Sequence, residues 1–195
     1  MTGFIHFDSS PDANWRAIVL FGRNSASYKF ALAKTLLESA EAQRTEIAIK
    51  DLADPSSRHI CEHLKQADRQ CTQPRSRFLD ACRKHNANQL SRTELNDVTV
   101  QFGFQNVSDA FHVVGSGDVA CRFFEDDRKG GDRIVLTDDL LSLVGEPEAS
   151  SFALETEARW RLVETAWKQG IAASLLDIVP DENLQRFVVM AGDGR

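Results

Sequence analysis

The residues best suited to chemistry in this sequence are two histidines whose spacing brings both to one face of a helix. His59-Ile-Cys-Glu-His63 matches the H-x-x-E-H pattern of a class of zinc proteases. In that pattern His59 and His63 would bind one metal and Glu62 would be the general base. A third ligand would have to come from elsewhere, with Glu155 or Glu157 as candidates. Histidine pairs beside an apolar stripe also occur without metal, so both interpretations stay open.

Other patterns associated with catalysis are incomplete. Lys84-His85-Asn86 has the His–Asn spacing of a nuclease, but no second metal ligand follows in a strand–loop–helix context. The glycines at 115, 117, 130 and 131 are not followed by the Gly-Lys-Ser/Thr of a phosphate-binding loop. The four cysteines show no C-x-x-C spacing, which is typical of reduced thiols in a cytoplasmic protein. We therefore expect no catalytic site, no metal and no cofactor in this chain.

A more specific signal is the start of the helix that we expect to begin at Asn24 or Ser25 and run to about Ala42. On a helical wheel Lys29 falls in the middle of the apolar arc, within the first turn. A buried unpaired ammonium is costly, so this lysine must either extend past the helix start or meet an anion. Free N–H groups at the helix start add a partial positive charge. This cluster could hold a phosphate or a base, and it comprises Arg23, Asn24, Ser27, Tyr28 and Lys29.

Charge is distributed unevenly along the chain. The net charge is −6, which argues against a protein that coats nucleic acid by charge alone. From Ala13 to Leu37, however, there are four basic residues and no acid, and from Arg69 to Lys84 there are five basic residues against one acid. From Glu125 to Glu164 there are eleven acids against five basic residues. Solvated helix faces are the alternative explanation of these runs.

The elements that must position these residues are mainly helices. Ser10-Pro11 is a good start for a helix through Phe21, which Gly22 ends. Pro55 suits the first turn of a helix that carries Ile60, Leu64, Ala67 and Cys71. Two shorter helices are expected at 77–84 and 91–102, the second opened by a Ser-x-x-Glu capping box.

The character changes after Gly115. Segments 119–124 and 133–136 flank a turn-rich run and indicate a β-hairpin. A short helix is expected at 138–144, and a strong one at 153–168 with Trp160, Val163 and Trp167 on its buried face; a strand is possible at 185–190. We predict an α+β, mostly helical fold, a helical body with one β-hairpin, compatible with a winged-helix-like arrangement. The chain is expected to be a single domain, 1–195, helical over 10–114, with the hairpin and C-terminal helix in 115–195.

Several separated segments together resemble a known group of proteins. They are Trp15–Lys34, Arg58–Lys65, Ser76–Cys82, Asp109–Val114, Arg122–Phe124, Leu136–Leu141 and Glu157–Trp167. With them the chain resembles the N-terminal region of bacterial HNH endonucleases of restriction or phage-defence type. The family is named for a C-terminal nuclease domain, and the sequence ends at Arg195, about where that domain would begin. The histidine base and metal ligands of an HNH site are not present in this sequence.

By this resemblance the chain is expected to be the part that selects double-stranded DNA, including modified DNA, for the nuclease. A divalent metal is expected only for the absent HNH domain. The predicted DNA-binding residues are Arg23, Asn24, Ser27, Tyr28, Lys29, Arg69, Arg75 and Arg77.

Two alternatives to DNA recognition remain. The chain could be a protein-interaction or regulatory module that binds a defence partner or its own nuclease domain through the acidic C-terminal half. A homodimer is a further partner that the sequence leaves open. The chain could also be a metallohydrolase based on His59, Glu62 and His63. No apolar run reaches the length of a membrane span and no signal peptide is recognisable, so a cytoplasmic location is expected.

Overall fold

The computed structural model describes residues 10–22, 24–145, 147 and 149–171, together with the backbone of two C-terminal strands, 176–181 and 186–191. The described helices are α1 (Pro11–Phe21), α2 (Tyr28–Glu41), α3 (Ile49–Leu64), α4 (Arg77–Asn86), α5 (Arg92–Phe102), α6 (Val107–Ala110), α7 (Asp138–Gly145) and α8 (Ala149–Gln169). The strands are β1 (Glu46–Ala48), β2 (Val113–Val114), β3 (Gly117–Asp118), β4 (Phe124–Asp127), β5 (Arg133–Leu136), β6 (Leu176–Asp181) and β7 (Arg186–Ala191). The prediction of an α+β, mostly helical fold is confirmed.

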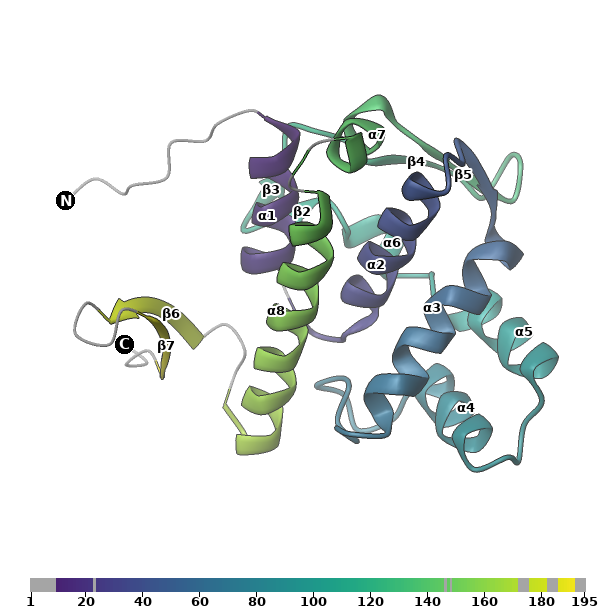
Figure 1. The fold of residues 1–195 in the computed structure, drawn as a ribbon. Helices are drawn as coiled ribbons and strands as arrows, with labels where there is room; N and C mark the ends of the chain where they lie inside the picture. The colour runs from purple at the N-terminus through teal and green to yellow at the C-terminus, as the bar shows by residue number, and fades with distance from the viewer. Residues whose placement is uncertain are drawn as a thin grey trace.

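Helix α2 lies at the centre of the helical body (Figure 1). It packs against α7 and α8 on one side and α3 on the other, while α1 lies beside α8, and α4 and α5 lie against α3. Ten of its fourteen residues are buried, which explains why its sequence is apolar on nearly every side. The start of this central helix is therefore surrounded by several other elements.

The predicted hairpin is part of a three-stranded antiparallel sheet in the order β1-β5-β4. Ile47 pairs with Ile134, and Phe124 pairs with Leu136, and all four side chains are buried. The first hairpin strand begins at Phe124, where the prediction had it end, because this register places Phe124 and Leu136 on the core side. The strand order is that of a winged helix, but four helices separate β1 from β4, so the match is one of strand order only. Two further hairpins, β2-β3 and β6-β7, are present.

The predicted starts of α2 and α3 were wrong, and long-range contacts explain the error for α2. Helix α2 starts at Tyr28 and not at Asn24 or Ser25. Residues 25–27 instead pair with the loop before α4: Ala26 forms a β-bridge with Cys71, and Thr72 N donates to Ser25 O. Helix α3 starts at Ile49 and continues through Pro55. Proline removes one helical hydrogen bond, so the packing of α3 against α2 and α5 must compensate for its loss.

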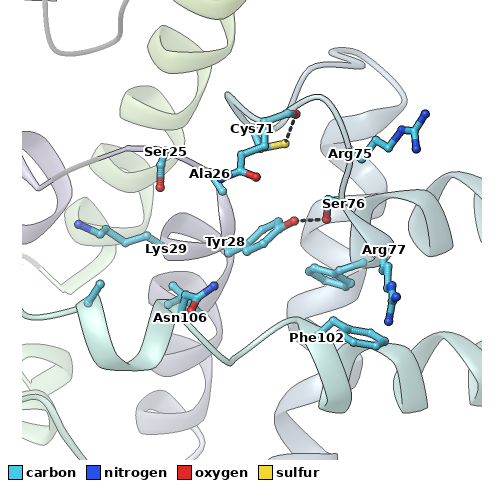
Figure 2. Close-up of a pocket in the computed structure, with 14 residues that line it drawn as sticks. Ser25, Ala26, Tyr28, Lys29, Cys71, Arg75, Ser76, Arg77, Phe102 and Asn106 are labelled. Atoms are coloured by element: carbon cyan, nitrogen blue, oxygen red, sulfur yellow. Dashed lines mark hydrogen bonds between the residues drawn. The ribbon is translucent and has the colours of Figure 1, made fainter.

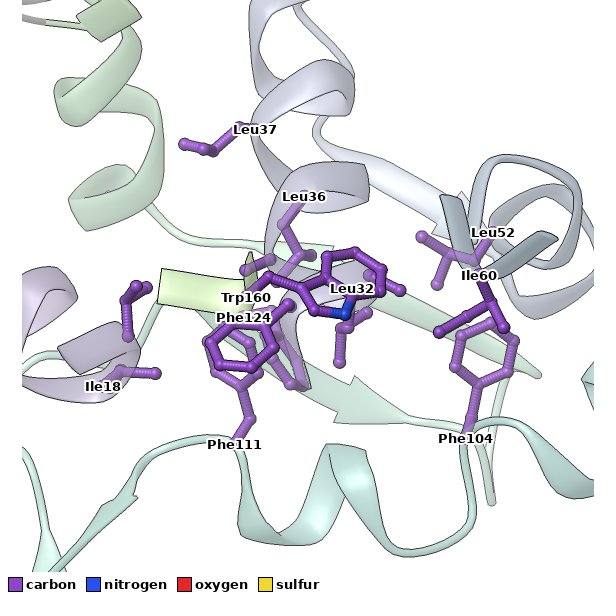
Figure 3. Close-up of a cluster of buried hydrophobic side chains, with 14 of the residues drawn as sticks. Ile18, Leu32, Leu36, Leu37, Leu52, Ile60, Phe104, Phe111, Phe124 and Trp160 are labelled. Atoms are coloured by element: carbon purple, nitrogen blue, oxygen red, sulfur yellow. The ribbon is translucent and has the colours of Figure 1, made fainter. Parts of the chain in front are cut away.

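The core is built from aromatic and branched side chains contributed by both ends of the described chain. Trp15 of α1 meets Phe123 edge-on at 5.1 Å, and Trp160 of α8 lies 5.8 Å from Phe30 of α2, measured between ring centroids. Figure 3 shows how Ile18, Leu36 and Trp160 converge from three helices. Trp160, Val163 and Trp167 are buried as predicted. Among the residues described, no helix has both the length and the apolar character needed to cross a membrane.

Candidate functional site

A cavity of about 350 Å³ opens where the starts of α2 and α4 meet the segment that joins α5 to α6. We call it the Lys29 cavity (Figure 2). Its polar lining consists of Ser25, Tyr28, Lys29, Gln73, Arg75, Ser76, Arg77 and Asn106, and its rings are Tyr28, Phe78 and Phe102. The charged lining side chains are all cationic. Such a cavity has the size of a small ligand site and the charge to favour an anion.

Tyr28 holds the two helix starts together. Its hydroxyl is 2.5 Å from the Ser76 hydroxyl, and its ring meets Phe78 edge-on at 5.2 Å. Burial raises the pKa of Tyr28 to about 12, so the phenol is neutral. Ser76 is the N-cap of α4 and accepts a hydrogen bond from Leu79 N. The first turn of α4, with its free N–H groups, is thereby fixed at one end of the cavity.

Lys29 lies at the other end, where Figure 2 shows its Nζ directed away from Tyr28. The side chain is only 5% exposed, and Nζ has no hydrogen-bond partner among the residues that the structure describes. Burial lowers the pKa of Lys29 to about 8. A Cβ added to Gly22 would lie 2.2 Å from this Nζ and 2.4 Å from Ile18 O, so the glycine makes room for the ammonium at the C-terminal end of α1. The partial negative charge of that helix end offsets some of the cost of burial.

Arg75 and Arg77 stand at the α4 end and are exposed. The Arg77 guanidinium lies over the Phe102 ring at 5.2 Å, a cation–π contact that also orients it. Neither arginine makes an ion pair within the described structure. By contrast, Arg83 on the same helix is paired with Asp68 and Asp80.

The same division, between arginines that have a carboxylate partner and arginines that do not, applies to all the described arginines. Of the thirteen whose side chains are described, eight form ion pairs with carboxylates. The five that do not are Arg44, Arg69, Arg75, Arg77 and Arg159. Three of these five belong to the short segment 69–77. Among the described arginines, those without a carboxylate partner are therefore concentrated beside the Lys29 cavity.

The structure brings together four of the predicted binding residues and separates the others. Tyr28, Lys29, Arg75 and Arg77 line the cavity, whereas Asn24, Ser27 and Arg69 do not. Ser27 is fully buried, and both its backbone N–H and its hydroxyl donate to Gln70 O. Arg69 is exposed and donates to Trp167 O. Arg23 lies outside the described residues.

Sequence reasoning missed Ser76, Phe102 and Asn106 as lining residues. Ser76 carried a local signal, since a serine before an amphipathic segment predicts a helix cap. Phe102 and Asn106 carried none, because only the folding of α5 and α6 brings them into the lining of the same cavity as Tyr28.

The two histidines of the H-x-x-E-H pattern face different partners. His59 Nε2 is 2.9 Å from a Glu38 carboxylate oxygen on α2, and His63 contacts two glutamates on α8. Glu62 points to solvent. Among the residues that the structure covers, no three His, Cys, Asp or Glu side chains are grouped so that they could hold a metal ion. The geometry does not favour the metallohydrolase hypothesis.

His63 is instead the centre of a buried polar group, which we call the His63 cluster: His63, Gln70, Glu157, Trp160 and Glu164. His63 Nδ1 is 2.7 Å from Glu164 and Nε2 is 3.2 Å from Glu157, while the ring stacks on Trp160 at 3.4 Å. Gln70 donates to Glu164 and accepts from Trp160 Nε1.

Glu157 also joins the cluster to the surface. Burial alone would raise the pKa of its carboxyl, but hydrogen bonding from Lys34 and the charge of His63 outweigh burial and lower it to about 2. The Lys34 ammonium lies 2.8 Å from Glu157. Each member of the cluster has a polar partner within the protein, which is the arrangement of a structural network.

The Lys84-His85-Asn86 pattern, which has the His–Asn spacing of a nuclease, also has a structural role. His85 Nδ1 is 2.9 Å from Leu90 O, and Asn86 donates to Cys61 O, so this pair stabilises the end of α4.

Comparison with known proteins adds no family to this description: no family model matches the chain, and neither the curated proteins nor the solved structures contain a significant match.

Proposed function

We propose that this chain is a nucleic-acid recognition domain that is not catalytic by itself and binds the phosphate backbone of double-stranded DNA. The observation that carries the proposal is the gathering of unpaired cations, Arg75, Arg77 and Lys29, around one cavity. Phosphate contacts from arginine and from helix N-termini are the usual means by which proteins fix themselves on a duplex.

The overall charge makes this surface selective. A chain with a net charge of −6 is repelled from DNA at most orientations. Among the arginines, attraction is then strongest at the segment that holds Arg69, Arg75 and Arg77, because most other described arginines are paired with carboxylates. The proposal therefore predicts oriented binding through the starts of α2 and α4.

Fluorescence polarisation with a labelled duplex at low salt tests the proposal. Arg75→Ala combined with Arg77→Ala should weaken binding at least about tenfold, because two phosphate contacts are lost. Arg122→Ala combined with Arg133→Ala is the matched control: it removes the same charge from arginines that are paired with Asp118, Glu46 and Asp127. If no duplex binds at low salt, or if both double variants lose affinity equally, the proposal fails.

The resemblance to HNH endonucleases suggests where such a domain would act. In that setting it would bring a C-terminal nuclease domain to DNA, and restriction or phage defence would be the biological role. The chemistry and its divalent metal would belong to the nuclease domain. Joining this chain to an HNH domain should then make cleavage depend on Arg75 and Arg77.

A protein-interaction module is the second candidate. It is favoured by two exposed large apolar side chains, Phe21 at 66% and Leu154 at 70% exposure, on the neighbouring helices α1 and α8. Isolated exposed apolar residues are common on protein surfaces, so this observation is weaker than the cluster of cations. Association with a partner or a second copy that persists at high salt and is lost in Phe21→Ser with Leu154→Ser would favour this candidate.

A further inference from the structure

Among the described elements, the C-terminal hairpin stands by itself. Figure 1 shows β6 and β7 apart from the helical body, and no other described element packs extensively against either strand. A hairpin of two strands is only marginally stable in water, and a third strand or a packing partner is usually needed to stabilise it. There is therefore a physical reason for this hairpin to associate with a further strand.

The register of the hairpin gives it one apolar face. Alternate residues of a strand share a face, and the two residues of a cross-strand pair lie on the same face. By this rule six residues share the first face, and all are apolar: Leu176, Ile178, Pro180, Phe187, Val189 and Ala191. The second face is mixed and includes Asp177, Asp181 and Arg186. This pattern is typical of strands in a wider antiparallel sheet that has one side turned from water.

The edge of β6 is blocked by Pro180. In an antiparallel ladder, pairs that exchange hydrogen bonds alternate with pairs whose backbone N–H and C=O groups face away from the partner strand. Proline has no N–H, so Pro180 fits opposite Phe187 without the loss of a bond only if this pair is of the second kind. A proline then stands in the outward row of β6, where it interrupts pairing with another strand.

The edge of β7 is open. By the same alternation, Phe187, Val189 and Ala191 direct their backbone N–H and C=O groups away from β6. Each of these residues has an N–H, and none is charged. An uninterrupted, apolar strand edge is a template for pairing with another chain.

We propose that β7 pairs with β7 of a second copy of this chain, which joins two hairpins into one antiparallel sheet of order β6-β7-β7-β6. With the two-fold axis at Val189, this residue lies opposite the partner's Val189, and Phe187 lies opposite the partner's Ala191. All three outward residues of each strand are then bonded, and the apolar face continues across the interface. The β7 edge is thus complementary to itself, as a two-fold interface requires. This inference does not depend on DNA binding.

Sedimentation velocity of the full chain over a concentration series tests the pairing. We expect a dimer with a dissociation constant of about 100 µM or below, weak because one short strand edge makes a small interface. Val189→Pro removes the central N–H of the β7 edge and should weaken dimerisation at least about tenfold. Ile178→Pro is the matched control: it changes the other residue of the same pair, on the same face but on the β6 edge, and should leave the dimer intact.

A cysteine at the two-fold axis tests the register without a proline in the strand. Residues opposite each other in a hydrogen-bonded antiparallel pair have Cα atoms about 5.5 Å apart, within the range that a disulfide spans. Val189→Cys should therefore form a covalent dimer on mild oxidation. Ile178→Cys, on the outer strand of the proposed sheet, should not. The four native cysteines are buried and are present in both variants.

The outcomes decide what occupies the β7 edge. A wild-type chain that stays monomeric at about 100 µM would overturn the inference and leave the edge to a strand of another protein. Equal loss of the dimer in Val189→Pro and Ile178→Pro, or no covalent dimer of Val189→Cys, would also overturn it. A dimer lost only in Phe21→Ser with Leu154→Ser would assign dimerisation to α1 and α8 instead. Duplex binding is measured separately, so its failure would leave this inference standing.

Discussion

Two regions of this molecule bury charge and treat it in opposite ways. In the His63 cluster, the imidazole lies between Glu157 and Glu164 and each polar member has a partner. In the Lys29 cavity, the ammonium is similarly buried and has no partner within the described part of the chain. Removing one partner from a buried pair is costly, whereas an unpaired buried charge is already a cost that the rest of the fold must offset. The His63 cluster thus has the arrangement of a stabilising network, and binding at the Lys29 cavity is what we propose.

The two regions share a segment, which makes the contrast sharper. The loop that follows α3 supplies the Gln70 side chain to the His63 cluster. The backbone oxygen of Gln70 accepts two hydrogen bonds from Ser27, two positions before Lys29. One loop thus connects a fully paired network to the start of α2. Variants on the two sides of this loop should separate stability from binding.

The largest effect is expected from Glu164→Ala. It leaves His63 and Gln70 without their shared carboxylate, so the free energy of unfolding should fall by about 3–5 kcal/mol. Glu155→Ala, which breaks a half-exposed pair with Arg16, should cost less than about 1 kcal/mol. Urea denaturation measures both. A loss below about 1 kcal/mol for Glu164→Ala would show that the cluster is not structural.

The next effect concerns the stability contributed by Lys29 as a function of pH. Its pKa is about 8 in the folded protein and near 10.5 when unfolded, so between these values the unfolded chain binds more protons. The free energy of unfolding should therefore rise from pH 8 towards pH 10.5, by about 3 kcal/mol in total. Lys29→Met should lack this rise and be more stable than the wild type at pH 7.

Denaturation from pH 7 to pH 10 gives the free energy of unfolding of the wild type and of Lys29→Met. The difference between these two free energies at each pH isolates the contribution of Lys29. Tyr28 acts in the opposite direction above pH 10, because its pKa is raised to about 12, but it is present in both proteins. Parallel curves for wild type and Lys29→Met would contradict the description of Lys29 as a buried, unpaired charge.

A smaller loss of stability is expected from Gly22→Ala. The added methyl would meet Lys29 Nζ and, less avoidably, the backbone oxygen of Ile18, at 2.2 and 2.4 Å. We expect a cost of about 1–3 kcal/mol, measured by thermal unfolding. In the double variant with Lys29→Met the cost should fall only in part, since the Ile18 contact remains. A neutral Gly22→Ala would mean that the end of α1 can move.

The smallest effect is expected from Arg83→Ala. Asp68 and Asp80 already neutralise this guanidinium, so duplex affinity should change less than about threefold. Arg77→Ala, six positions earlier on the same helix, should weaken binding more because Arg77 has no carboxylate partner among the described residues. Polarisation titrations at one salt concentration compare the two. Equal losses would mean that pairing within the chain does not decide which arginines bind DNA.

Much of the fold could be predicted because it is recorded in local pattern. Ser10-Pro11 and the Ser91–Glu94 capping box fixed two helix starts, and both are present. The buried face of Trp160, Val163 and Trp167 followed from helical spacing. Lys29 on the apolar arc was visible on the wheel for the same reason.

Long-range contacts account for what could not be predicted. The start of α2 moved because residues 25–27 pair with the loop at 70–72, more than forty positions away. Gly22 looked like a helix breaker, and its role in making room for Lys29 Nζ depends on how α1 meets α2. Glu157 was named only as a candidate third metal ligand beside the histidines. Its contact with His63 is real, but Glu164, which makes the shorter contact, was not foreseen.

The central claim is that the unpaired arginines beside the Lys29 cavity bind DNA phosphates, and a salt series tests it most directly. Duplex affinity is measured between about 50 and 200 mM salt for wild type, for Arg75→Ala with Arg77→Ala, and for the matched control Arg122→Ala with Arg133→Ala. The slope of log affinity against log salt should be shallower by about 2 in the first variant and unchanged in the control. Equal slopes in all three proteins, or no binding at the lowest salt, would contradict it.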